Sequence, residues 1–318
     1  FFSKSSHLYF GKMAQAFQKA VKDAAENPSE YWGAVAQRVH WFRPYSKVLD
    51  DSQAPFYRWF PGGLFNTCYN ALDIHVEEGR GNKVAVIYDS PVAGIQRHIT
   101  YTQLRDEVAI FAGALQSRGV TKGDCVLIYL PMVPEAFVAM LGCARIGAIH
   151  SVVFGGFAAG ELCNRINAAT PKCLITASCG LLTVDRAMPY KPIVDEAIIQ
   201  ANHKPEFCVV LQRPQVKASM SWRDIEWDTF VANAKPVSCV PLDSNDYLYV
   251  LYTSGTTGNP KGIVRDNAGH CVALMWTMDN IYGVGDDDVF WASSDIGWVV
   301  GHSYIIYAPL FRGITTVM

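Results

Sequence analysis

The chain has 318 residues, which is enough for about two average domains. Half of its residues are hydrophobic and 18% are charged, a balance that indicates a folded core rather than a disordered chain. The net charge is −2 and the pI is about 6.5, so no basic excess points to nucleic acid. The longest apolar stretch, 125–141, is interrupted by Pro131, Pro134 and Glu135, so we expect no membrane span.

Nine cysteines are scattered along the chain, and no two of them form a C-x-x-C pair. Most of them lie in apolar segments. An odd number of cysteines without metal-ligand spacing indicates buried, reduced thiols in a cytosolic or matrix protein. We therefore expect no zinc site and assign no metal ligand.

Residues 1–22 contain four lysines and no acidic residue, and Met13, Phe17, Val21 and Ala24 fall on one helical face. A basic segment poor in acids is typical of a mitochondrial presequence, although arginine is absent here. Two interpretations stay open: the tail of a presequence, or an ordinary amphipathic helix. Residues 31–70 are rich in aromatic side chains, so we expect an irregular arm that packs on a domain through its rings.

From about residue 82, apolar strand patterns alternate with helical ones, with Gly119 stopping one helix and Pro134 opening the next. Strands are expected at 84–88, 126–130, 149–154, 173–176, 207–211 and 247–251, and helices at 100–118, 134–146 and 158–168. This alternation predicts an α/β fold of mostly parallel sheets sandwiched by helices. Residues 213–245 are expected to form a covering excursion.

A loop rich in glycine and hydroxyl groups lies between two expected strands, and residues 252–262 read YTSGTTGNPKG. Its glycines let the main chain approach a ligand, its hydroxyls and backbone N–H groups donate hydrogen bonds, and its lysine adds a positive charge. These properties suit the phosphates of a nucleotide, and a polar turn without a ligand is the alternative. The loop is not a Walker A motif, because Gly262 follows Lys261 where Ser or Thr is needed. The candidate phosphate-binding residues are Thr253, Ser254, Gly255, Thr256, Thr257, Gly258 and Lys261.

This loop resembles the signature T-S-G-T-T-G-x-P-K-G of the adenylate-forming enzymes. Within that superfamily the arm resembles the propionyl- and acetyl-CoA synthetase branch, because 59–66 match W-F-x-G-G-x-x-N and 69–75 match Y-N-x-x-D-x-H. The resemblance implies an N-terminal helical and aromatic arm at 1–75 and, at 76–318, the N-terminal part of an adenylate-forming large domain. It also implies an AMP-forming ligase that uses ATP, Mg²⁺ and coenzyme A to activate a short-chain carboxylate.

The resemblance also implies sites for CoA. The segment 143–157 is similar to this branch, in which the second glycine of the turn packs against the adenine of CoA, which implies Gly156. A tight strand–helix turn is the alternative. The branch places an arginine near the 3′-phosphate of CoA in an E-P-G-R-like motif, and only Arg186 matches it, with one residue more in the spacing. A solvated surface arginine is the alternative there.

The resemblance places the acyl pocket at 291–304. It implies wall residues Trp298, Val299 and Val300, with Val300 also near CoA. A core position is the alternative for Trp298, and His302 is either a polar lining group or a core histidine. Val300 and Arg265-Asp266 are typical of the propionate-type members, so we expect propionate to be favoured over acetate.

The later motifs of the superfamily, including its adenylation lysine, have no match in 1–318, so no catalytic residue is assigned. We therefore expect a fragment with little or no ligase activity of its own. The alternative function is a non-catalytic homologue that acts as a nucleotide- or CoA-binding module. The expected compartment is the mitochondrial matrix, with the cytoplasm as the alternative.

Overall fold

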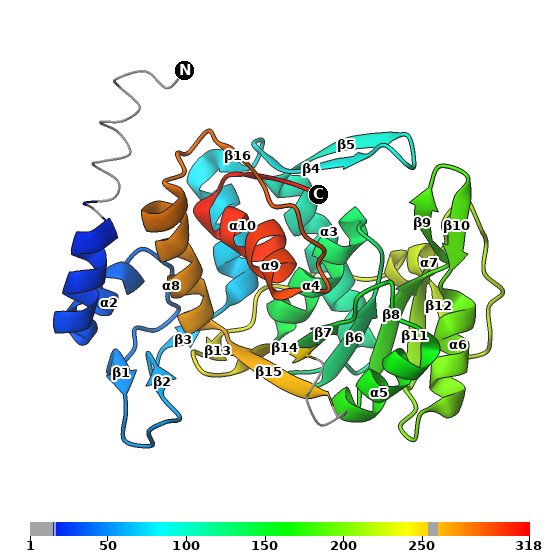
Figure 1. Ribbon diagram of the computed structural model, residues 1–318, viewed down its shortest axis with the longest axis horizontal. Coiled ribbons are helices and arrows are strands. Elements are labelled where there is room, and N and C mark those ends of the chain that lie inside the picture. Colours follow the sequence, from blue (N-terminus) through cyan, green and yellow to red (C-terminus); the bar gives the residue numbers. More distant parts are fainter. Residues whose placement is uncertain (1–14, 16, 254–259) are drawn as a thin grey trace.

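The computed structural model describes residues 15, 17–253 and 260–318. Its main element is a seven-stranded sheet in the order β12-β11-β8-β6-β7-β14-β15, and every neighbouring pair is parallel except β14 and β15. Figure 1 shows this sheet across the lower half of the molecule. The strands are β6 (Cys125–Tyr129), β7 (Ile149–Val152), β8 (Cys173–Ala177), β11 (Phe207–Leu211), β12 (Asp224–Glu226), β14 (Tyr247–Thr253) and β15 (Lys261–Asp266).

Helices cover both faces of this sheet, as the continuous apolar strands predict. Along β6, Val126 and Ile128 pack into one buried cluster, whereas Leu127 and Tyr129 pack into another. The first cluster includes α3 (Tyr101–Ser117), α4 (Pro134–Ile146) and α7 (Trp227–Val231), and the second includes α5 (Ala159–Ala169) and α6 (Lys191–Gln200). The predicted α/β class is therefore confirmed.

Local chemistry explains where these helices begin and end. Thr100 and Gln103 form a capping box at the start of α3, and Gly119 follows the end of that helix with φ of +78°. Pro134 opens α4 and Gly147 closes it in the left-handed conformation. The predicted bounds of α4 and β11 are confirmed residue for residue, while β7 ends two residues earlier than expected because the chain turns at Phe154.

A second sheet joins distant parts of the chain in the order β16-β17-β4-β5. β16 (Val289–Trp291), β17 (Thr315–Val317) and β4 (Val84–Ser90) run parallel, and β5 (Ile95–Thr100) runs antiparallel to β4. Figure 1 shows this sheet along the upper edge. Three two-stranded sheets complete the fold: β1 (Leu49–Asp50) with β2 (Arg58–Trp59), β3 (Leu64–Phe65) with β13 (Leu242–Asp243), and β9 (Cys179–Thr183) with β10 (Arg186–Pro189).

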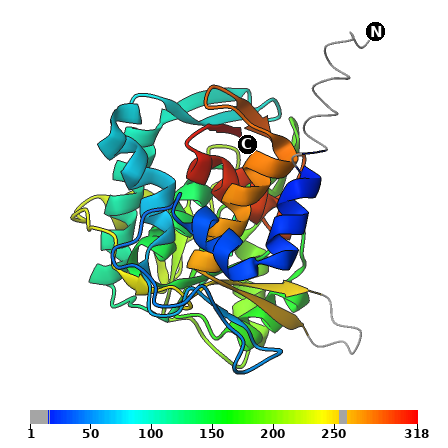
Figure 2. The ribbon, with the colours of Figure 1, turned by 90° about the vertical axis from the view of Figure 1, so that its left-hand side faces the viewer.

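The aromatic arm packs through its rings as predicted. Trp41 lies 5.5 Å from Phe60 and 5.1 Å from Phe65 between ring centroids. Trp32, on α2 (Pro28–Ala36), lies 5.8 Å from Trp276 on α8 (Ala268–Thr277), and Figure 2 shows α2 beside α8. The remaining helical segments are η1 (Tyr69–Asp73), η2 (Val76–Arg80), η3 (Met278–Tyr282), α9 (Val299–Gly301), η4 (His302–Tyr307) and α10 (Ala308–Arg312).

The predicted excursion at 213–245 is only partly a covering segment. It supplies β12, which extends the main sheet at one edge, and α7, whose Trp227 stacks on Phe111 of α3 at 4.6 Å. Within the described part of the chain, no helix has the length and apolar character needed to cross a membrane.

Candidate functional site

The parallel strands of the main sheet all end, at their carboxyl termini, on the same side of the sheet. The strand order reverses between β6 and its neighbours β7 and β8. From β6 the chain moves to β7 on one side, and then crosses back to β8 on the other side. Ligands bind at such a switch point in open α/β sheets. A cavity of about 260 Å³ lies there, and the residues that follow β6, β7, β8 and β11 contribute to its wall. Its lining comprises Tyr88, Ser90, Val92, Pro131, Met132, Phe154, Gly155, Gly156, Gly180, Leu181, Leu182, Met188, Tyr190, Arg213 and Asp295.

Glycines keep this cavity open. A Cβ on Gly156 would lie 2.4 Å from the ring of Phe154, and a Cβ on Gly155 would lie 2.2 Å from the hydroxyl oxygen of Tyr190. The same hydroxyl would lie 2.7 Å from a Cβ on Gly180. Side chains at these positions would collide with Phe154 or Tyr190 in the cavity wall, so the glycine turn (residues 154–157) needs its glycines. The structure thus places the predicted CoA residue Gly156 in the wall of a real cavity.

Hydrogen bonds from Tyr129, the last residue of β6, hold the glycine turn in place. The hydroxyl oxygen of Tyr129 lies 3.0 Å from the carbonyl oxygen of Gly155 and 2.8 Å from that of Phe157. The ring of Tyr129 lies 4.8 Å from that of Tyr190, and burial raises the pKa of Tyr190 to about 12. Both phenols are therefore neutral hydrogen-bonding groups near neutral pH.

The predicted Arg186 occupies a different place. It is the first residue of β10, it pairs with Thr183 across the tip of the β9–β10 hairpin, and its side chain is exposed. The hairpin contributes Gly180, Leu181 and Met188 to the cavity, whereas Arg186 is not part of the lining. Its contact with CoA stays a prediction.

Arg213 and Asp295 line the cavity, and neither was predicted as a site residue from the sequence. Arg213 is 8% exposed, and its Nη1 donates to the carbonyl oxygen of Cys179 at 3.2 Å. Burial raises the pKa of Asp295, although its carboxylate accepts a hydrogen bond from the backbone N–H of Gly297 at 2.7 Å. The signal that could have found Arg213 is its position at the carboxyl end of a buried parallel strand.

The predicted acyl segment (residues 291–304) lies against the glycine turn at Trp298. Trp298 precedes α9, and its ring centroid lies 5.6 Å from that of Phe154 and 6.4 Å from that of Phe157. Trp298 is 51% exposed, and Val299 and Val300 are also about half exposed. Trp298 is therefore not a core residue, and the three predicted wall residues lie together on an accessible surface.

His302 is a core histidine. It is fully buried, its Nδ1 lies 3.1 Å from the carbonyl oxygen of Trp298, and burial lowers its pKa to about 4. It belongs to a buried histidine cluster, which comprises His150, His270 and His302. The rings of Tyr249 and Tyr307 pack between these three side chains.

The residues that flank the predicted phosphate loop lie at the end of the main sheet that also carries the glycine turn. Thr253 ends β14, Lys261 begins β15, and the two residues pair across the hairpin with both side chains exposed. β14 is parallel to β7, so β14 ends and β15 begins at the same end of the sheet as the glycine turn. The candidates Ser254, Gly255, Thr256, Thr257 and Gly258 lie outside the described residues.

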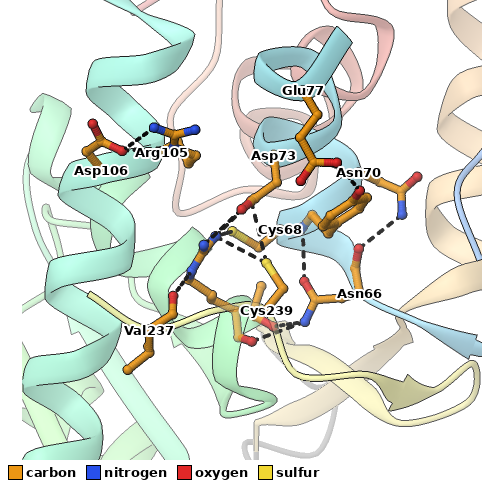
Figure 3. A network of polar contacts seen from close by, with 12 residues as sticks. Asn66, Cys68, Asn70, Asp73, Glu77, Arg105, Asp106, Val237 and Cys239 are labelled. Carbon is orange, nitrogen blue, oxygen red and sulfur yellow. Dashed lines mark hydrogen bonds and ion pairs between the residues drawn. The ribbon is translucent and has the colours of Figure 1, made fainter. Parts of the chain in front are cut away.

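A buried polar network joins the arm to the main domain (Figure 3). Nη1 and Nη2 of Arg145, on α4, each donate to a carboxylate oxygen of Asp73 at 2.8 Å. Nη1 also donates to the sulfurs of Cys68 and Cys239, at 3.5 and 3.1 Å. Cys68, Asp73 and Cys239 have the ligand spacing of a metal site. However, the guanidinium already binds all three groups, so its charge opposes a cation there.

The geometry defines an α/β protein with a cavity at a strand switch point, beside a candidate acyl surface. Residues 73–318 match the family described as "AMP-binding enzyme", and residues 17–71 match "Acetyl-coenzyme A synthetase N-terminus". The chain therefore belongs to the AMP-binding enzyme family, and the predicted resemblance to its short-chain synthetase branch is confirmed.

Several relatives carry more specific names. The chain is 52% identical to an uncharacterized protein of Pseudomonas aeruginosa, over 94% of this chain and 48% of that protein. It is 47% identical to the rat mitochondrial acyl-CoA synthetase short-chain family member 3, over 97% and 45% of the two chains. It is 43% identical to a propionate–CoA ligase of Salmonella typhimurium, over 95% and 48%.

Among solved structures, acetoacetyl-CoA synthetase from Streptomyces lividans matches with a TM-score of 0.84 at 26% identity. The match covers 93% of this chain and 45% of that structure. The chain thus spans about half the length of the curated relatives it matches.

Proposed function

We propose that this chain is the ATP-, acyl- and CoA-binding part of an AMP-forming ligase that joins a short-chain carboxylic acid to CoA. The observation that carries the proposal is the contact between the acyl segment and the glycine turn, at Trp298 and Phe154. Thioester formation requires the CoA thiol to reach the activated acyl carbon. A cavity for CoA that adjoins the acyl pocket is the arrangement that this reaction needs.

The proposed reaction has two halves. In the first, a carboxylate oxygen of the acid attacks the α-phosphorus of ATP, which forms an acyl-adenylate and releases pyrophosphate. In the second, the CoA thiol loses its proton and attacks the acyl carbon, which forms the thioester and releases AMP. The enzyme acts by positioning the reactants and stabilising charge. We propose that Lys261, Thr253 and the loop between them bind the departing pyrophosphate.

We propose propionate as the preferred acid. Val300 supports this preference, because propionate-type members of the branch carry valine where acetate-specific members carry threonine. Its half-exposed position on the acyl segment suits a pocket wall. One extra methylene contributes about 0.8 kcal/mol on burial, and such pockets discriminate by roughly 10- to 200-fold per methylene. The name of the Salmonella relative agrees with this choice of substrate.

The decisive experiment is ATP–pyrophosphate exchange, measured on the longest native gene product that contains this sequence. We expect exchange that depends on propionate and is weaker with acetate at equal concentration. We expect the 318-residue chain alone to show little or none, because no residue in it matches the adenylation lysine. Absence of exchange with both acids in the longer product would contradict the ligase proposal, whereas equal exchange would contradict only the choice of substrate.

Two accompanying properties belong to the same proposal. Mg²⁺ would accompany ATP, and we assign none of the described residues to it.

We propose the mitochondrial matrix as the compartment, supported by the basic, acid-free segment 1–22 and by the name of the rat relative. The bacterial relatives favour the cytoplasm instead. Fractionation of the source cells with an antibody against this chain distinguishes the two.

A further inference from the structure

The cavity at the switch point contains one buried cation, Arg213. This residue follows β11 directly, and its backbone N–H donates to the hydroxyl oxygen of Ser178 at 2.8 Å. Its side chain is held against the β9–β10 hairpin by the bond from Nη1 to the carbonyl of Cys179. Arg213 thus has a fixed position in the wall between two strand ends, unlike the exposed Arg186 at the hairpin tip.

Arg213 forms no ion pair with an acidic side chain among residues 17–253 and 260–318, although its charge acts on the partly buried Glu135 from a longer distance. The ion pairs found there involve other arginines and lysines. A guanidinium has five N–H donors, and only one contact from this side chain to a protein acceptor is present. Buried charges are normally paired, because an unpaired charge loses its hydration without compensation. The cavity therefore presents unused positive donors to whatever occupies it.

Asp295 lines the same cavity but does not neutralise Arg213. The two side chains form no ion pair within 4.0 Å, and Asp295 instead accepts the N–H of Gly297. Because the Asp295 carboxyl lines the same cavity, its ionised form would repel a second anion bound there. The remaining lining residues are apolar groups, glycines, a serine and two tyrosines.

We propose that Arg213 binds a phosphate group of the nucleotide portion of CoA, and that Asp295 weakens this binding by repulsion. This inference rests on the proposed CoA-binding function of the cavity and names the residues that determine affinity within it. A charge-assisted hydrogen bond to phosphate is among the stronger contacts a protein makes. Arg213, rather than Arg186, is then the main cation of the site.

The test uses adenosine 3′,5′-bisphosphate, the nucleotide end of CoA, with uncharged adenosine as the control ligand. Isothermal titration calorimetry on the 318-residue chain measures both affinities. We expect Arg213→Gln to weaken binding of the bisphosphate by about 10- to 100-fold, since bonds to charged groups are of this strength. Binding of adenosine should change much less. Arg186→Gln is the matched control, because it removes the same charge from the hairpin tip and should have a smaller effect.

Two further variants separate binding from folding. Arg213→Lys keeps the charge and should retain more affinity than Arg213→Gln. Asp295→Asn should tighten binding of the bisphosphate by about threefold or more, because it removes a repelling charge. A misfolded protein cannot produce such a gain.

The outcomes distinguish this inference from the function on which it rests. If the chain binds neither ligand, the proposed CoA site is wrong, and the role of Arg213 with it. If the chain binds the bisphosphate and Arg213→Gln binds it equally well, the role of Arg213 is wrong while the CoA site stands. A larger loss in Arg186→Gln, or no gain in Asp295→Asn, also contradicts the inference.

Discussion

At the scale of single residues, Gly297 sets the distance between the acyl segment and the glycine turn. A Cβ at this position would lie 2.6 Å from Cα of Phe154 and 2.9 Å from its backbone nitrogen. Backbone atoms cannot rotate away as a side chain can, so Gly297→Ala forces the two segments apart. We expect this substitution to lower the free energy of unfolding by about 1–3 kcal/mol, measured by denaturant unfolding.

Gly160→Ala is the matched control for that measurement. Gly160 lies in the first turn of α5, and a Cβ there would meet no atom within 4 Å. Alanine restricts the unfolded chain more than glycine does, so this change should be neutral or stabilise by up to about 1 kcal/mol. If both substitutions destabilise equally, the contact with Phe154 does not explain the glycine at 297.

Candidate site residues could be named from the sequence only where a motif marks them. Gly156, Trp298 and Val300 belong to contiguous motifs, and the structure brings them to one edge of the sheet. No motif marks Arg213. The end of a buried strand makes it one candidate among several, and only the strand order, which one sequence does not reveal, brings it to the cavity. Arg186 has a partial motif match, but the structure places it on an exposed hairpin tip rather than in the cavity wall.

At the scale of elements, the ion pair of Arg145 and Asp73 connects α4 to η1 of the arm. The side chains are only 5% and 12% exposed, so removal of one charge leaves the other buried without a partner. We expect Asp73→Asn to lower the free energy of unfolding by about 3–5 kcal/mol. Urea unfolding monitored by tryptophan fluorescence measures this loss.

Asp106→Asn is its control, because it breaks an exposed pair with Arg105 near the same network (Figure 3). Exposed pairs contribute about 0–1 kcal/mol, so this variant should unfold almost as the parent does. Similar losses in the two variants would mean that burial does not make the Arg145 pair important.

Elements with strong local signals could be predicted closely, and paired short strands could not. The helix 134–146 has a proline at its start and a glycine after its end, and both signals act locally. The β9–β10 hairpin carries no turn glycine between Thr183 and Arg186, so nothing in its composition marks it as a hairpin. The sequence does not predict β12, because no pattern in its three residues marks a strand. They become a strand by pairing with β11.

At the scale of the whole molecule, the buried histidine cluster and His75 make stability depend on pH. Burial lowers the pKa to about 3 for His270, to about 4 for His302 and His75, and well below its usual value for His150. Below about pH 6.5 the unfolded chain therefore binds more protons than the folded one. We expect stability to be full above this pH and to fall from pH 6.5 toward pH 4, by up to about 1.4 kcal/mol per pH unit for each histidine.

Denaturant unfolding at pH 7.5, 6.5 and 5.5 tests this dependence. The raised pKa of the buried carboxyls Asp266 and Asp295 acts in the opposite direction, because between the unfolded and the raised folded pKa the folded chain binds more protons at these groups. His270→Phe should reduce the slope, because both ring nitrogens of His270 lack hydrogen-bond partners within the described structure. A flat profile in the parent protein would refute the assignment.

The position of β17 between β16 and β4 has a consequence for biosynthesis. The hydroxyl of Thr315 donates to the carbonyl of Val84, 231 residues earlier, and the hydroxyl of Tyr101 donates to the carbonyl of Ile314. A ribosome that adds 5–20 residues per second needs roughly 10–45 s to make the chain between these partners. During that interval the β4–β5 hairpin has left the ribosome while one side of β4 is still unpaired. A nascent chain of this protein should therefore be a substrate for chaperones that bind exposed strand edges.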